Sequence, residues 1–216
     1  YDYGFEYLAA FSSRGPTADN RIKPDIVSPG AQVLSAGSQP DRSNECDPPT
    51  RPNYSTFIED DNQPGGVNNG YGVTFMQGTS MATPVTAGTA AIVRQYFEDG
   101  YYPTGKPRDI NKMNPSGALV KAVLMNSGVL IKGSQSTDSK IKSTDMYDVH
   151  QGFGRTTINN ALKLEGENDI STYVQDRRHI ERLQFETFDF TLTSCSLNQF
   201  SVMLVWTDPA GPITGA

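Results

Sequence analysis

The stretch "GVTFMQGTSMATPVTAG", residues 72–88, limits what this chain can fold into more than any other. "GVTFMQ" predicts a β-strand, and the Ala-rich residues after Gly78 predict a buried apolar helix that runs to about Phe97. We expect Pro84 to fall in the first turn of this helix, where its missing N–H costs no hydrogen bond. A strand, a glycine turn and a helix therefore follow one another directly.

Ser80 lies where this helix is expected to begin. A helix N-terminus offers free N–H groups and a partial positive charge, and the N–H of a serine there can stabilise an oxyanion. Gly78 leaves room for a substrate backbone, and Thr79 has little bulk to block it. Serine and threonine are also the preferred helix N-caps, so the tripeptide by itself favours a cap over a nucleophile.

The sequence on either side predicts an α/β segment. Residues 25–38 predict two short strands around a Pro-Gly break, and residues 114–131 predict a second helix, capped by Asn114 with Pro115 in its first turn. One face of that helix carries three apolar residues, Leu119, Val123 and Leu124. Residues 152–164 predict a tight glycine turn, a short extended piece and a third helix. After about Gly166, apolar and polar residues alternate, which predicts antiparallel strands.

Residues 78–88, "GTSMATPVTAG", resemble the nucleophile motif of the subtilisin-like serine peptidases. Four further stretches resemble that family in the same order: "FSSRGP", "KPDIVSPG", "NPSGALVKAVLMNSG" and "QGFGRTTINNAL". The resemblance implies an α/β fold in which residues 1–165 form the C-terminal part of a three-layer peptidase domain with a parallel sheet. "SVMLVWTDPAG" resembles a strand of the jelly-roll-like β-sandwich that follows in larger members, so residues 166–216 are expected to begin such an antiparallel domain.

Carried over by position, the resemblance makes Ser80 the nucleophile of an endopeptidase that hydrolyses peptide bonds through an acyl-enzyme. Gly78 and Thr79 would shape the floor of the substrate pocket, and Met76 and Gln77 would edge the cleft that binds a polypeptide. In this family the catalytic Asp, His and oxyanion Asn precede the serine. Residues 1–79 hold no histidine and none of those motifs, so we expect them upstream of Tyr1 and expect this segment alone to be inactive.

Two alternatives stay open at this stage. An α/β-hydrolase esterase has the chain order Ser, Asp, His, which Ser80, one of three aspartates and His150 would match. Those aspartates are Asp109, Asp145 and Asp148. Against this alternative, Ala82 stands where that fold normally has Gly, and we expect His150 and His179 to be structural or surface residues. The second alternative is a catalytically dead, binding-only member of the subtilisin-like family.

The composition limits which kinds of partner and ligand the chain is expected to bind. A formal net charge of −6 argues against nucleic-acid binding, and no apolar run approaches the roughly 18 residues of a membrane span. Cys46 and Cys195 are expected to be unpaired thiols, without zinc-type spacing around them. The acidic "FIEDD" lacks calcium-ligand spacing, so we expect no metal and no cofactor, although several relatives of this kind bind calcium.

The long polar stretch of residues 39–72 predicts a surface loop beside the substrate cleft. The family resemblance favours a secreted or endomembrane location, such as a lysosome-like compartment.

Overall fold

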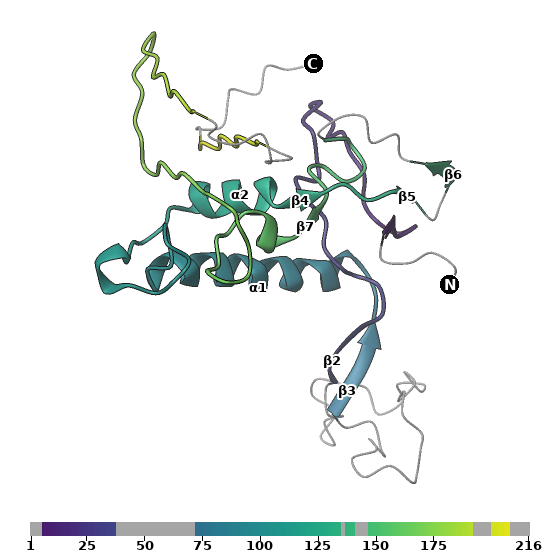
Figure 1. Ribbon diagram of the computed structural model, residues 1–216. Coiled ribbons are helices and arrows are strands. Elements are labelled where there is room, and N and C mark those ends of the chain that lie inside the picture. The colour runs from purple at the N-terminus through teal and green to yellow at the C-terminus, as the bar shows by residue number, and fades with distance from the viewer. Residues whose placement is uncertain (1–5, 38–71, 135–136, 141–146, 192–199, 208–216) are drawn as a thin grey trace, which may run out of the picture.

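The computed structural model describes residues 6–37, 72–134, 137–140, 147–191 and 200–207. The acidic "FIEDD", Cys46, Cys195 and all but the last residue of the expected long loop lie outside these residues. Within the described residues, two helices lie side by side in opposite directions. The short strands gather toward the end of the pair at which the first helix begins (Figure 1).

Helix α1 spans Thr79–Glu98, which confirms the predicted helix and places its end at "EDG". Val93, Tyr96 and Phe97 near its C-terminal end are buried, whereas Val85 and Ile92 are 36% and 52% exposed. The prediction of a helix buried along its length is therefore wrong for these described residues. The helix packed against α1 has 10 residues to its 20, so it is about 15 Å long and covers only half of α1.

Helix α2 spans Gly117–Asn126 and buries the predicted face of Leu119, Val123 and Leu124. These side chains pack against the buried half of α1, and Ala161 and Leu162 complete the same hydrophobic core. The predicted Asn114 cap is wrong. Ser116 is the N-cap, and its Oγ accepts a hydrogen bond of 3.1 Å from the Leu119 amide, while the Asn114 side chain accepts from Arg94 on α1.

Strand β7, Arg155–Thr156, confirms the predicted short extended piece, but a single 3₁₀ turn, η2, Ile158–Asn160, replaces the predicted third helix. A side chain takes a backbone group that a longer helix would use, because the Leu164 amide donates to Asn168 Oδ1 at 3.2 Å. The predicted glycine turn before β7 is confirmed, because Gly152 and Gly154 have φ values of 60° and 95°.

The remaining elements are short. They are β1 (Tyr7–Leu8), β2 (Val33–Gly37), β3 (Gly72–Met76), η1 (Asp109–Asn111), β4 (Gly128–Val129), β5 (Gly133–Ser134) and β6 (Thr137–Lys140). They form three separate small sheets, β1-β5-β6, β2-β3 and β4-β7. The β1-β5 pair and an isolated bridge between Val27 and Arg155 are parallel, and the other pairs are antiparallel. The expected three-layer parallel sheet is thus not formed within the described residues, because so few of their strand residues have a parallel neighbour.

The antiparallel strands expected after Gly166 do not form in residues 166–191 or 200–207. Those residues run as extended chain without a hydrogen-bonded neighbouring strand, and a strand needs such a partner to be stable. Aromatic side chains nevertheless bring them together, since the ring centroids of Phe190 and Phe200 lie 5.6 Å apart and those of Tyr173 and Phe190 lie 5.8 Å apart. Many large apolar side chains here remain exposed, including Phe185 at 90%.

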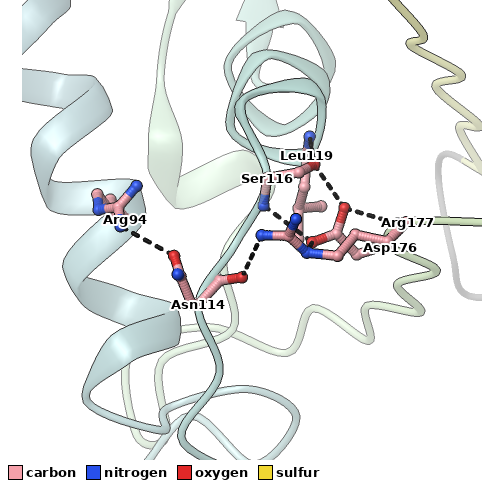
Figure 2. A network of polar contacts seen from close by, with 6 residues as sticks. All are labelled: Arg94, Asn114, Ser116, Leu119, Asp176 and Arg177. Carbon is pink, nitrogen blue, oxygen red and sulfur yellow. Dashed lines mark hydrogen bonds and ion pairs between the residues drawn. The ribbon is translucent and has the colours of Figure 1, made fainter.

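The segment after the core is tied back to α2 by Asp176 (Figure 2). Its carboxylate accepts hydrogen bonds from the Ser116 amide at 2.9 Å and the Ser116 hydroxyl at 2.5 Å. The neighbouring Arg177 donates to the Asn114 carbonyl at 3.2 Å. Because the Asp176 side chain is only 8% exposed and lies at a helix N-terminus, the partial positive charge there favours its negative charge.

We predict that Asp176→Ala destabilises the protein by about 1–3 kcal/mol, because it leaves two donors of Ser116 without their acceptor. Urea unfolding monitored by circular dichroism measures this difference. Asp109→Ala is the control, because the Asp109 side chain is 95% exposed and pairs only with Lys112 in its own turn. An equal effect of the two substitutions would contradict the role of Asp176.

Asp25 joins the chain before β2 to helix α2. One of its carboxylate oxygens lies 2.5 Å from Lys23 Nζ and 3.2 Å from Lys121 Nζ. Burial raises the pKa of Asp25, but hydrogen bonds and charge attraction from the two lysines outweigh burial and hold the pKa below its ordinary value of 3.8.

A lowered pKa in the folded state means that Asp25 stabilises the fold above pH 3.8, and that this stability is lost as the pH falls through the folded-state pKa. We therefore expect Asp25→Asn to lower the unfolding temperature at pH 6, and this difference from wild type to shrink as the pH falls below 3.8. Lys121→Gln, which removes one of the two donors, should give a smaller loss over the same pH range. A pH-independent difference between wild type and Asp25→Asn would contradict this account.

Candidate active site

The five residues singled out from the sequence lie at one junction, where strand β3 leads into helix α1. Met76 ends β3 opposite Val33 of β2, and it is 53% exposed. Gln77 follows as an exposed connecting residue, Gly78 is the N-cap of α1, and Thr79 is its first residue. Gly37 pairs with Gly72 at the end of the β2-β3 pair opposite to Met76.

Gly78 sets the direction in which the chain enters the helix. Its backbone has φ 149° and ψ 168°, a region that only glycine adopts readily. The Gly78 amide donates a 2.8 Å hydrogen bond to the carbonyl of Gly30, and its own carbonyl accepts from the Met81 amide at 3.0 Å. This turn is therefore fixed on one side by the helix and on the other by the segment before β2.

Ser80 is the second residue of α1, and its side chain is exposed. The N-cap is Gly78, and among the described residues no side chain caps this helix. The interpretation of Ser80 as a helix cap is therefore wrong. The first turn also carries no acidic residue, so no carboxylate of that turn competes for the partial positive charge and free amides of the helix N-terminus.

Pro84 is the sixth residue of α1 rather than part of its first turn, so that prediction is wrong. In a regular helix the amide at this position would donate to the carbonyl of Ser80, and proline has no amide hydrogen to donate. The helix therefore lacks one backbone hydrogen bond at the residue that carries the candidate nucleophile.

Sequence reasoning missed residues that pack against this turn from other parts of the chain. Gly30 approaches so closely that a Cβ atom built on it would lie 2.7 Å from the Gly78 carbonyl oxygen. The hydroxyl of Ser28 lies 2.7 Å from that of Thr86 on α1 and 3.3 Å from that of Thr156 on β7. The one signal in the sequence was the Ser-Pro-Gly triplet at residues 28–30, which indicates a break between strands but not what it contacts.

The residues of the esterase alternative are engaged elsewhere. Asp148 Oδ1 accepts from the backbone amides of His150 and Gln151, and the His150 ring nitrogen Nδ1 lies 3.4 Å from the same oxygen. Asp109 pairs with Lys112, whose hydrogen bond lowers the pKa of Asp109. Asp145 lies outside the described residues. Within the residues that the structure describes, no hydrogen bond or ion pair joins Ser80 to His150 or to His179.

In the described part of the chain, no group of three or more His, Cys, Asp and Glu side chains is placed to hold a metal ion. No helix among the described residues is both long and apolar enough to cross a membrane.

The profile of the subtilase family matches residues 4–154, a range that contains the Gly78–Ser80 turn and the residues packed on it. The chain belongs to the subtilase family. This assignment confirms the resemblance seen in the sequence and supports an α/β fold.

The relatives of this chain include named proteases. A serine protease/ABC transporter B family protein, tagB, of Dictyostelium discoideum is 35% identical over 77% of this chain and 8% of its own length. The minor extracellular protease Vpr of Bacillus subtilis is 32% identical over 74% of the chain and 14% of its own. Pyrolysin of Pyrococcus furiosus is 28% identical over 75% of the chain and 9% of its own. The chain thus spans about a tenth of the length of these relatives.

Because its side chain caps nothing, Ser80→Ala should leave the free energy of unfolding within about 0.5 kcal/mol of wild type. Ser116→Ala is the matched comparison, since Ser116 does cap a helix, and its loss should cost about 0.5–2 kcal/mol. Urea unfolding of both variants tests the contrast. Equal destabilisation would show that Ser80 stabilises its helix after all.

Proposed function

We propose that this chain carries the nucleophile of a subtilisin-like serine endopeptidase, and that Ser80 is that nucleophile. The observation that carries the proposal is the state of Ser80: it is exposed, it follows a glycine turn, and it occupies the second position of a helix that no side chain caps. A serine with a structural role at this place would cap the helix with its hydroxyl, as Ser116 caps α2.

The reaction is acyl transfer to water. A histidine removes the proton of Ser80 Oγ as that oxygen attacks the carbonyl carbon of a peptide bond. The carbonyl oxygen becomes an oxyanion, which the Ser80 amide and the N-terminus of α1 stabilise. The intermediate collapses to an acyl-enzyme, and the amine leaves with the proton from the histidine. Water then attacks the ester and releases the acid.

The residues around Ser80 serve binding of the polypeptide. Gly78 has no side chain to obstruct a substrate backbone, and Thr79 is exposed beside it. Met76 and Gln77 are exposed at the end of β3, where they can contact the side chains of an extended substrate. In this proposal no metal and no cofactor take part in the chemistry.

The base, its aspartate and the oxyanion asparagine are assigned to sequence upstream of Tyr1, which would complete the three-layer domain with its parallel sheet. The exposed face of α1 supports this assignment, because Val85, Gly88 and Ile92 lie on one side of the helix and are exposed among the described residues. The exposed alternating side chains Phe200, Val202, Leu204 and Trp206 support a β-sandwich beginning within residues 166–216.

Partners and location follow from the same assignment. The substrate is a polypeptide, and the net charge of −6 disfavours binding of nucleic acid. We propose a secreted or endomembrane location, because a relative is named an extracellular protease.

The test is Ser80→Ala in the protein expressed with its preceding sequence, assayed on casein and with a fluorophosphonate probe. Removing the nucleophile of subtilisin itself costs about 2 × 10⁶ in kcat, and we expect a loss on that order. His150→Ala is the control and should keep full activity. Loss of labelling in His150→Ala would favour the esterase alternative, and an unlabelled wild type would favour a catalytically dead binding protein.

A further inference from the structure

The segment Val27–Gly30, called here the anchor segment, lies between β7 and the turn that presents Ser80. On one side, the Val27 amide donates to the Gly154 carbonyl at 2.9 Å and the Thr156 amide donates to the Val27 carbonyl at 3.3 Å. On the other side, the Gly30 carbonyl accepts the Gly78 amide at 2.8 Å. The anchor segment therefore links the Ser80 turn to a part of the chain more than 70 residues later.

A second attachment joins the anchor segment to the side of α1. Thr86 donates its hydroxyl hydrogen to the Ala82 carbonyl at 3.2 Å, so the 2.7 Å contact with Ser28 requires Ser28 to be the donor. Ser28 then has no hydrogen left, and its 3.3 Å contact with Thr156 requires Thr156 to donate. The result is a chain of hydroxyls with one direction, from β7 to the carbonyl of Ala82, two residues after Ser80.

Gly30 allows the two attachments to coexist. A Cβ atom at residue 30 would lie 2.7 Å from the Gly78 carbonyl oxygen and 3.1 Å from the Ala82 side chain. Backbone and a helical Cβ cannot move aside as the end of a flexible side chain can, so the turn itself would have to shift. The same carbonyl of Gly78 accepts the first amides of α1, so a shift there reaches the start of the helix.

We propose that Gly30, Ser28 and Thr86 are positioning residues for the nucleophile, a role that rests on the proposed peptidase function of Ser80. The Gly30 carbonyl and the hydroxyl chain fix the turn and the second turn of α1 to one rigid support. Pro84 removes the backbone hydrogen bond that would otherwise hold the Ser80 carbonyl, so the start of the helix depends more on this support.

The test uses the protein expressed with its preceding sequence and compares Thr86→Val with Thr89→Val. Both residues lie on α1 and donate to the carbonyl four residues earlier, but only Thr86 contacts the anchor segment. We expect Thr86→Val to lower kcat and the rate of fluorophosphonate labelling about tenfold, with KM within twofold of wild type, because displacement of a reacting group by about 1 Å can cost 10²-fold. Thr89→Val should match wild type, and Thr86→Ser, which keeps the hydroxyl, should restore the rate.

A second pair tests Gly30. Gly30→Ala should lower kcat about 100-fold, whereas Gly117→Ala adds the same methyl group in open space at the start of α2 and should leave kcat unchanged. Combining Ser28→Ala with Thr86→Val should lower kcat no further than either change alone, because both break the same contact.

The outcomes separate the two proposals. An unlabelled wild-type protein would overturn the peptidase function and this inference together. A labelled wild type with equal kcat in Thr86→Val and Thr89→Val would overturn the positioning role alone. A loss of kcat in Thr86→Val that Thr86→Ser does not rescue would also overturn it, because the effect would then not come from the hydroxyl.

Discussion

The hydrogen bond from the Gly78 amide to the Gly30 carbonyl joins the two parts of the chain on which the candidate site depends. It can form at 2.8 Å only because residue 30 has no Cβ and because residue 78 can adopt a φ of 149°. The direction of α1, and with it the position of Ser80, follows from this contact.

The two ends of α1 serve different purposes. The C-terminal half is packed through Val93, Tyr96 and Phe97 against α2, and the Tyr96 hydroxyl donates to the Lys163 carbonyl at 2.9 Å. Burial raises the pKa of Tyr96 to about 12, so this hydroxyl stays a donor at neutral pH. The N-terminal half leaves its first turn uncapped and exposed. The C-terminal half of α1 is thus held in the core, whereas its N-terminus keeps free amides. This arrangement suits the proposed role of that N-terminus in stabilising an oxyanion.

Much of this arrangement was predictable from local sequence. The strand, glycine turn and helix around Ser80 formed as predicted, because glycine and Ala-rich apolar residues have strong local preferences. Predictions failed where side-chain contacts decided the outcome. Residues 158–160 form a single 3₁₀ turn in place of a longer helix because the Leu164 amide donates to the Asn168 side chain. Ser116 caps α2 where Asn114 was expected, because Arg94 engages the Asn114 side chain.

The sequence by itself determined the family, the candidate nucleophile and the order of elements around it, since each is encoded in a contiguous motif. Only the tertiary structure decided that Ser80 caps nothing, that Pro84 lies beyond the first helical turn, and that Ser28, Gly30, Thr86 and Thr156 meet. The last of these residues follows Ser28 by 128 positions, and a pattern of neighbouring residues carries no information about contacts made by side chains so far apart in the chain.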